Sequence, residues 1–282
     1  MPPADTASPG DTRVRYAVFD LDGTLIGPDG RPYDRMVNAI AGLGDRGIVP
    51  ILATGRSRDG LTALTEAASL VSLFDDEILL SNGDALFHRV AGRLRCDRTI
   101  PADVIPRLLA EGIKDLVFEY EGAHIALSRR AGMAYAVAFG RKRRDIDVWT
   151  ADAPAPSPTS VTVLGATAHR DPGRLTALLS GLNCTLYPLE AFQAVVVHSA
   201  ETCKATALAA HLRSRFTEPG LERVMAFGNG DNDVTLVSRS GIGVAVQDST
   251  PAARASAKVN LHGPLADFLA SDDFTALLTH GA

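Results

Sequence analysis

The chain has 282 residues, 46% of them hydrophobic and 22% charged, which is the composition of an ordinary globular protein. Its net charge of −5 argues against a general nucleic-acid-binding protein, and no stretch is apolar over the length that a membrane helix needs. Three cysteines without metal-ligand spacing are typical of a reducing cytoplasm, where we expect the protein. Residues 1–14 contain several prolines and no apolar segment, which predicts a disordered tail.

The first predicted strand ends in a pair of aspartates. Residues 16–19 form an apolar run, which predicts a buried parallel strand, and Gly23 and Thr24 then break it. Asp20 and Asp22 would therefore lie at the carboxyl end of a strand, where ligands bind in open α/β sheets. Two carboxylates this close indicate a cation, a shared proton or a pair of catalytic roles, whereas a solvated turn is the alternative.

Strands and helices continue to alternate up to Gly83. A helix after residue 34, with Asp34 as its predicted cap, leads to a strand at 48–53, and a helix at 58–70 leads to a strand at 78–80. This alternation predicts a parallel sheet that is covered on both faces. Thr54 and Gly55 follow the second strand, where a hydroxyl and free backbone N–H groups can hold an anion. A plain helix cap is the alternative for that turn.

The pattern changes between residues 84 and 199. Short strand-like runs at 86–88, 117–119, 125–127, 161–163 and 194–197 are interleaved with helical segments at 101–111 and 172–180. Such an arrangement indicates an α+β domain with an antiparallel sheet. The proline-rich segment 151–160 is predicted to be a stiff linker inside this domain.

The last third of the chain returns to the first pattern. Lys204 stands at the head of a helical stretch, where a lone lysine is usually solvated. A third apolar strand at 224–227 leads into residues 228–233, Gly-Asn-Gly-Asp-Asn-Asp. This loop is rich in the oxygen ligands that Mg²⁺ prefers, and its spacing excludes an EF-hand. A strand at 243–246 and a helix at 265–278 complete the pattern.

These segments, taken in order, resemble the signatures of the haloacid dehalogenase superfamily of phosphohydrolases. The signatures are Asp20–Thr24, Thr54–Arg56, Lys204 and Gly228–Asp233, and the Asn82-Gly83 pair is similar to an element of the Cof-type branch. The resemblance implies an α/β fold, with a Rossmann-like doubly wound parallel sheet in a core of residues 15–83 and 200–282. Residues 84–199 would form an inserted α+β cap domain.

The resemblance also implies a role for each matching residue. Asp20 would be the nucleophile, forming an aspartyl-phosphate, and Asp22 the general acid and base. The implied phosphate-binding residues are Thr54, Gly55, Lys204 and Asn232, and the implied ligands of a Mg²⁺ cofactor are Asp20, Asp22, Asn229 and Asp233. Asn229 stands where relatives usually have aspartate. Asp231 is an additional carboxylate, so which of these two side chains completes the metal site remains open.

The expected function is a Mg²⁺-dependent phosphatase, a phosphoric monoester hydrolase, acting on a small phosphorylated metabolite, with a sugar phosphate as the first candidate. A phosphotransferase or phosphomutase would use the same residues, and only the fate of the phosphoryl group separates it from a phosphatase. A non-catalytic protein that binds a phosphorylated ligand is the third alternative, because Asn229 departs from the usual pattern. We expect no nucleic-acid or membrane partner. The sequence leaves the substrate, the residues that select it and the oligomeric state open.

Overall fold

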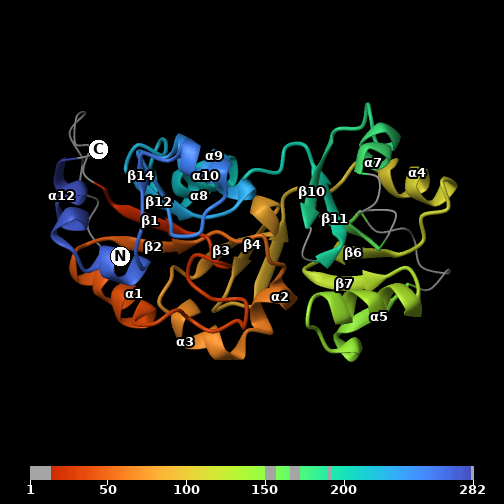
Figure 1. Ribbon diagram of the computed structural model, residues 1–282, viewed down its shortest axis with the longest axis horizontal. Coiled ribbons are helices and arrows are strands. Elements are labelled where there is room, and N and C mark those ends of the chain that lie inside the picture. Colours follow the sequence, from red (N-terminus) through yellow and green to blue (C-terminus); the bar gives the residue numbers. More distant parts are fainter. Residues whose placement is uncertain (1–13, 150–156, 166–171, 190–191, 281–282) are drawn as a thin grey trace. The chain divides into compact units, whose positions relative to one another are not determined.

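The chain forms two compact units in the computed structural model, which describes residues 14–149, 157–165, 172–189 and 192–280 (Figure 1). The first unit comprises Met1–Thr54, Leu64–Ile78 and Lys204–Ala282, and the second comprises Gly55–Ala63 and Leu79–Cys203. Apart from Val14, the predicted tail lies outside the described residues, as does most of the predicted linker. Among the described residues, no helix combines the length and the apolar character needed to cross a membrane.

A five-stranded parallel sheet forms the centre of the first unit, as predicted. Its strands, in spatial order, are β14 (Val259–Asn260), β13 (Ile242–Ala245), β12 (Val224–Gly228), β1 (Tyr16–Phe19) and β2 (Val49–Leu52). All four residues of β1 are buried, which explains why that strand is apolar throughout. The rings of Phe19 and Phe227 stack 4.5 Å apart on neighbouring strands and lie fully buried in the core.

Helices lie on both sides of this sheet. Figure 1 shows α8 (Lys204–Phe216), α9 (Val234–Arg239) and α10 (Pro251–Ser256) on one side, and α1 (Met36–Asp45) and α3 (Ala68–Val71) on the other. This is the doubly wound arrangement that the alternating pattern predicted.

Three helix boundaries differ from the prediction. Arg35, in the left-handed conformation and without a side-chain cap, precedes α1, so Asp34 is not its cap. The predicted helix at 58–70 is broken into α2 (Arg58–Thr62), a 3₁₀ turn (Thr65–Ala67) and α3. The predicted helix at 265–278 consists of α11 (Leu265–Leu269) and α12 (Asp272–His280), because Ser271 accepts a hydrogen bond from the Phe274 amide and starts a new helix.

A six-stranded sheet dominates the second unit. Its strands, in spatial order, are β10 (Cys184–Leu189), β11 (Ala194–Ser199), β9 (Ser160–Leu164), β6 (Leu116–Tyr120), β7 (Ala123–Ala126) and β8 (Ile146–Val148). All neighbours are antiparallel except β7 and β8, which are parallel. The predicted α+β unit with an antiparallel sheet is therefore confirmed, although β8 and β10 were not predicted.

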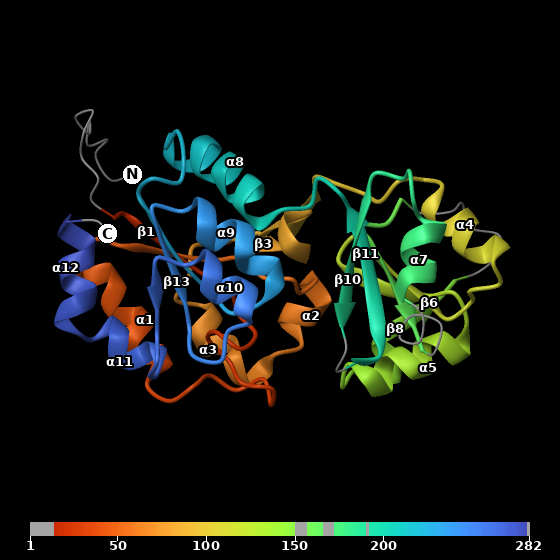
Figure 2. The ribbon, with the colours of Figure 1, turned by 45° about the horizontal axis from the view of Figure 1, so that its top comes forward.

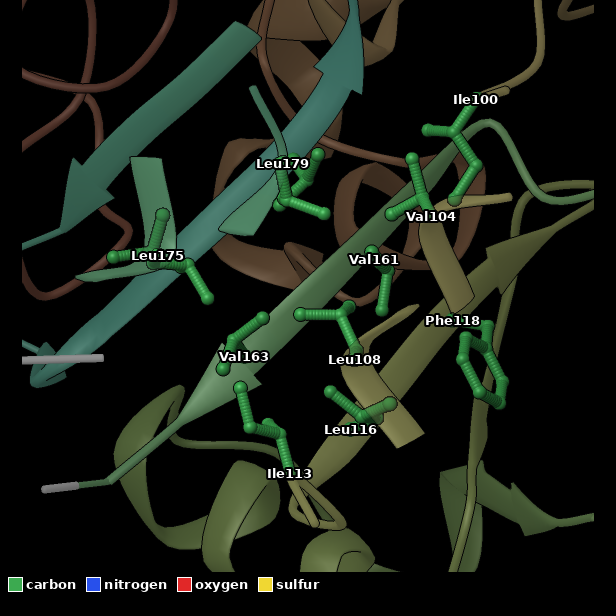
Figure 3. Packing of buried hydrophobic residues seen from close by; sticks show 12 residues of the cluster. Ile100, Val104, Leu108, Ile113, Leu116, Phe118, Val161, Val163, Leu175 and Leu179 are labelled. Carbon is green, nitrogen blue, oxygen red and sulfur yellow. The ribbon is translucent and has the colours of Figure 1, made fainter. Parts of the chain in front are cut away.

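Helices also cover the two faces of this second sheet. Figure 2 shows α4 (Val104–Ala110) and α7 (Pro172–Leu178) close together, with α5 (Arg129–Ala138) on the other side of the strands. The face under α4 and α7 is the larger apolar core, in which Leu108 and Val161 are fully buried (Figure 3). The face under α5 is smaller and includes Val117, Ala126 and Tyr135.

A short third sheet contains β3 (Glu77–Leu80), β4 (Ala85–His88) and β5 (Arg93–Cys96). The turn between β3 and β4 has positive φ at Ser81 (50°), Asn82 (57°) and Gly83 (102°). Glycine adopts this region freely and asparagine more readily than most residues, so Ser81 is the residue that the surroundings must hold there.

Candidate active site

The candidate site lies at the carboxyl ends of β1 and β12. The chain proceeds from β1 to β2 on one side, whereas β12 and β13 lie on the other, so the connections diverge between β1 and β12. Such a switch point is where open α/β sheets bind ligands. The Asp20 amide donates to the Phe227 carbonyl over 2.9 Å, and the Ala53 amide donates to the Phe19 carbonyl over 2.9 Å. The segments that follow β1, β2 and β12 therefore begin side by side.

Lys204 joins two of the predicted aspartates. Its Nζ lies 2.6 Å from Oδ1 of Asp20 and 2.7 Å from Oδ1 of Asp233. All three side chains are buried, and Lys204 is only 1% exposed. The usual interpretation of a lysine in a first helical turn, a solvated side chain, is therefore wrong for Lys204. Three segments far apart in the sequence meet at one buried ion-pair network.

The charges of this network do not cancel. Burial raises the pKa of Asp20 to about 7, the neighbouring Asp233 adds to this effect, and Lys204 opposes it. The two carboxylates in turn raise the pKa of Lys204 against the effect of its burial, so the ammonium stays charged. When both carboxylates are ionised, the network carries a net negative charge in a buried place, and additional positive charge would stabilise that form.

Backbone amides hold Asp233 in position. Its Oδ2 accepts hydrogen bonds from the amides of Asn229 and Gly230, each over 3.0 Å, while Oδ1 faces Lys204. Gly228 is required at the end of β12, because a Cβ there would lie 2.5 Å from the Cβ of Asp233. The glycines of this loop thus let the backbone close tightly around one carboxylate.

Asn229 packs against the aspartate motif. A Cβ on Gly23, whose φ is +77°, would lie 2.4 Å from Nδ2 of Asn229. The Thr24 hydroxyl donates to Oδ1 of Asn229 over 3.1 Å, a contact that the sequence analysis did not include. Asp22 is exposed, whereas Asp20 is buried.

The other acidic residue of the loop has a different partner. Oδ1 of Asp231 accepts a hydrogen bond from the Thr250 hydroxyl over 2.7 Å, and Thr250 is the cap of α10. Asp231 is exposed. The side chain of Asn232 lies over Gly230, where a Cβ would approach its Oδ1 to 2.5 Å. Asn229, and not Asp231, is therefore the side chain of this loop that packs against the Asp20–Thr24 segment.

The predicted phosphate-binding turn begins at a buried threonine. Thr54 follows β2 and is 1% exposed, whereas Gly55 is exposed and belongs to the second unit. Within that unit, a Cβ on Gly55 would lie 3.0 Å from Oδ1 of Asn82. The Ser81 amide donates to the Arg56 carbonyl over 2.9 Å. The positive-φ turn and the Gly55–Arg56 turn thus support each other.

The donor set suits a hard divalent cation. Asp20 supplies a buried carboxylate, Asn229 supplies an amide oxygen, and the network has an excess negative charge. Within the described part of the chain, no three Asp, Glu, His or Cys side chains form a metal-binding cluster by themselves. A cation at this place would therefore also need backbone, amide or substrate oxygens.

Comparisons with known proteins agree with this geometry. A model of the haloacid dehalogenase-like hydrolases matches residues 17–160 and 174–262. An HMP-PP phosphatase of Shigella flexneri serotype 5b (strain 8401) is 26% identical over 280 residues, covering 95% of each chain.

Two solved structures share the fold. A HAD/COF-like hydrolase from Plasmodium vivax has a TM-score of 0.76 at 18% identity, covering 92% of this chain and 95% of its own. A HAD subclass IIB sugar phosphatase has a TM-score of 0.72 at 18% identity, covering 94% of this chain and 99% of its own. With its matched sequence, its parallel sheet and its inserted α+β unit, the chain belongs to the haloacid dehalogenase-like hydrolase family, as one of the Cof-type phosphatases.

Proposed function

We propose that the protein is a Mg²⁺-dependent phosphatase that hydrolyses a small phosphorylated metabolite through an aspartyl-phosphate on Asp20. The observation that carries this proposal is the buried bridge from Lys204 to Asp20 and Asp233, with Nζ–Oδ1 distances of 2.6 and 2.7 Å. The paired ammonium opposes the rise in the pKa of Asp20 that burial and Asp233 cause, and so favours the ionised form of its carboxylate. An ionised carboxylate at the end of a strand is what a nucleophile for phosphorus requires.

The proposed reaction has two steps at Asp20. An oxygen of its carboxylate attacks phosphorus, and the bond from phosphorus to the leaving oxygen breaks while Asp22 gives that oxygen a proton. Water then attacks phosphorus of the aspartyl-phosphate and loses its proton to Asp22, which releases inorganic phosphate and restores Asp20. The exposure of Asp22 suits this role, because it must exchange protons with both the substrate and water.

The proposed Mg²⁺ ligands are Asp20, Asn229 and the backbone carbonyl of Asp22. Asp233 would position Asn229, whose amide donates to its Oδ2. When bound, Mg²⁺ would supply the positive charge that lets an anionic carboxylate and an anionic phosphoryl group meet. Thr54, Gly55, Lys204 and Asn232 are the proposed partners of those oxygens. Lys204 is already charged and desolvated, so it can interact strongly with a phosphoryl group.

The names of similar proteins support a small substrate. One relative is an HMP-PP phosphatase and one structural neighbour is a sugar phosphatase. We retain a sugar phosphate as the first candidate and place the reaction in the cytoplasm, where the free thiols of Cys96, Cys184 and Cys203 would persist.

A phosphate-release screen with Mg²⁺ over sugar phosphates, nucleotides and cofactor phosphates tests the proposal. The wild type should release phosphate from at least one of these esters, and Asp20→Asn should release none, because an amide cannot form the phosphoenzyme. Both proteins should show the same circular dichroism spectrum. Substantial turnover by Asp20→Asn would exclude the covalent mechanism, and transfer to an acceptor without free phosphate would indicate a phosphotransferase.

A further inference from the structure

Thr24 has a buried hydroxyl whose proton needs an acceptor. The residue ends the Asp20–Thr24 segment and is 1% exposed. Its hydroxyl donates to Oδ1 of Asn229 over 3.1 Å, and among the described residues this is the one hydrogen bond of its side chain. A buried donor without an acceptor costs free energy, so this hydrogen bond defines Thr24 as the donor and Oδ1 of Asn229 as the acceptor.

The backbone of Asn229 is held on both sides. Its amide donates to Oδ2 of Asp233 over 3.0 Å, and its carbonyl accepts a hydrogen bond from the Thr250 amide over 2.8 Å. Neither of these hydrogen bonds involves the side-chain amide of Asn229. The orientation of that side chain therefore depends on the groups that surround it.

The two ends of the Asn229 side-chain amide have different neighbours. Oδ1 accepts the hydrogen bond from Thr24, whereas Nδ2 is the atom that a Cβ on Gly23 would approach to 2.4 Å. Turning the amide over would place its N–H groups against the Thr24 hydroxyl, and the proton of that hydroxyl would lose its acceptor. Thr24 therefore selects one of two orientations that have nearly the same shape.

A side-chain amide needs this selection, whereas a carboxylate does not. The oxygen of an asparagine side chain can coordinate a hard cation, but its nitrogen carries two protons and acts as a donor. An aspartate at the same position would offer an equivalent oxygen in either orientation. The hydrogen bond from Thr24 thus has a consequence for cation binding that depends on residue 229 being asparagine.

We propose that Thr24 is a positioning residue, which orients the side chain of Asn229 so that its oxygen is the atom available to the cation. An amide oxygen has two lone pairs, and Thr24 uses one of them, so the other remains for the cation. Hydrogen bonds that orient a metal ligand contribute about 10-fold to 100-fold in metal affinity. The inference rests on the proposed Mg²⁺-dependent function and adds to it the residue that makes a neutral ligand effective.

A second threonine near the same loop supplies a matched control. The Thr250 hydroxyl donates to Oδ1 of Asp231 over 2.7 Å, and Thr250 reaches Asn229 through its backbone amide. Thr250→Val therefore removes a hydroxyl that is bonded to the 228–233 loop but retains the backbone contact with Asn229. The orientation of the Asn229 side chain should be unaffected by this change.

Cation binding without substrate tests the proposal. Mn²⁺ is titrated with the protein and followed by the electron paramagnetic resonance signal of the free ion, and competition by Mg²⁺ gives the Kd for Mg²⁺. Thr24→Val should bind Mg²⁺ about 10-fold to 100-fold more weakly than the wild type. Thr24→Ser retains the hydroxyl and should bind within about 3-fold of the wild type, as should Thr250→Val. Circular dichroism checks that each variant is folded, and Thr24→Ala replaces the valine variant if that one is not.

A double-mutant cycle separates positioning from a purely structural role. In the Asn229→Asp background both side-chain oxygens are equivalent, so adding Thr24→Val should change the Kd for Mg²⁺ by less than about 3-fold. If Thr24→Val weakens binding by the same factor with asparagine and with aspartate, it acts only on the packing of its segment, and the proposal is wrong. A Thr24→Val protein that binds Mg²⁺ as tightly as the wild type, or a wild type that binds no cation, would contradict it equally.

Turnover at limiting and saturating Mg²⁺ separates this inference from the proposed function. Thr24→Val should lose rate at limiting Mg²⁺ and approach the wild-type kcat at saturating Mg²⁺, because the substitution impairs cation binding and not the chemical step. If the wild type hydrolyses no ester but the cycle shows the expected coupling, Thr24 positions Asn229 and the phosphatase proposal fails. If hydrolysis occurs and the cycle shows no coupling, the phosphatase proposal stands and Thr24 is not a positioning residue.

Discussion

Lys204 determines the electrostatics of the candidate site, because it is the cation between the buried carboxylates of Asp20 and Asp233. Its ammonium favours the ionised form of Asp20, which burial opposes. The same ammonium is also proposed to bind phosphoryl oxygens, so a bound substrate would share it with the two carboxylates. The proposed nucleophile and the ammonium proposed to bind the substrate's phosphoryl oxygens are therefore in contact before any ligand binds.

The exposed position of Asp22 leads to a prediction about leaving groups. Asp22→Asn should lower the rate about 10²-fold to 10⁴-fold, the usual contribution of a positioned general acid. The loss should be largest for sugar phosphates and smallest for p-nitrophenyl phosphate, whose leaving group needs little protonation. Measuring kcat for both substrates in both proteins checks this. An equal loss on the two substrates would remove the general-acid role.

A second residue-scale prediction concerns the Mg²⁺ requirement. Asn229 contacts Gly23 and Thr24, whereas Asp231 is hydrogen bonded to Thr250. Asn229→Asp adds a carboxylate beside Asp20 and should lower the Mg²⁺ concentration for half-maximal activity about 10-fold, the factor that corresponds to roughly 1.4 kcal/mol.

Asp231→Ala is the matched variant, because it changes a carboxylate of the same loop. It should leave that Mg²⁺ concentration nearly unchanged, since its hydrogen-bond partner is Thr250, the cap of α10. If Asp231→Ala raises the required concentration and Asn229→Asp does not lower it, Asp231 is the ligand. If neither substitution moves it, the loop does not supply the metal ligands.

The sequence predicted the positions of these residues better than their surroundings. Asp20 and the 228–233 loop follow apolar runs, so their placement at strand ends could be inferred locally. The ion pairs of Lys204 depend on residues 184 and 29 positions away, and no local pattern carries that information. The same holds for Thr24, whose hydroxyl donates to Asn229, a residue from a distant part of the chain.

At the scale of elements, the strands that could be predicted were those that contain a run of consecutive apolar residues. The strands β5 and β14 were missed because β5 is mostly exposed and β14 has only two residues. The helix α5 was missed because its sequence, with two arginines and a glycine, has no clear apolar stripe. At residues 58–71 the spacing of apolar residues predicted helical conformation correctly. It did not predict that the helix would be divided into two short helices with a 3₁₀ turn between them.

The packing of α4 gives a matched pair of variants. Leu108 is fully buried among Val161, Leu175 and their neighbours (Figure 3). Leu109, the next residue, is 38% exposed. Leu108→Ala should lower the free energy of unfolding of the second unit by about 2 to 5 kcal/mol, and Leu109→Ala by less than about 1 kcal/mol.

Trp149, the single tryptophan of the chain, reports on this unit because its ring lies against Phe118 at 6.5 Å. Urea unfolding followed by its fluorescence measures both variants. Equal destabilisation by Leu108→Ala and Leu109→Ala would mean that the face under α4 is not the packed core.

At the scale of the whole molecule, polar groups are buried in both units. In the second unit a row of side chains crosses the sheet from His198 through Ser160 and Glu119 to His124. Asp84 accepts from the Thr202 hydroxyl over 2.6 Å and pairs with His198 at 3.0 Å. These contacts, with the bond from Ser81 to Glu119, hold the turn at 81–83 in its strained conformation. Buried titratable groups of this kind make stability depend on pH.

His124 gives that dependence a sign that can be measured. Burial, with the charge of Arg141 adding to it, lowers its pKa to about 4 in the folded protein. The pKa is about 6.5 in an unfolded chain, so the unfolded state binds more protons between these values. The contribution of His124 to stability is therefore complete above about pH 6.5 and is lost as the pH falls toward 4, by at most about 3 kcal/mol.

Glu119, whose pKa is raised by burial, acts in the opposite direction, since it favours the folded state at low pH. The comparison with His124→Phe cancels that effect, because both proteins retain Glu119. Urea unfolding followed by Trp149 fluorescence should show the free energy of the wild type falling relative to His124→Phe as the pH is lowered from 7 to 4. A difference between the two proteins that stays constant over this range would mean that His124 is protonated as readily in the folded state as in the unfolded chain.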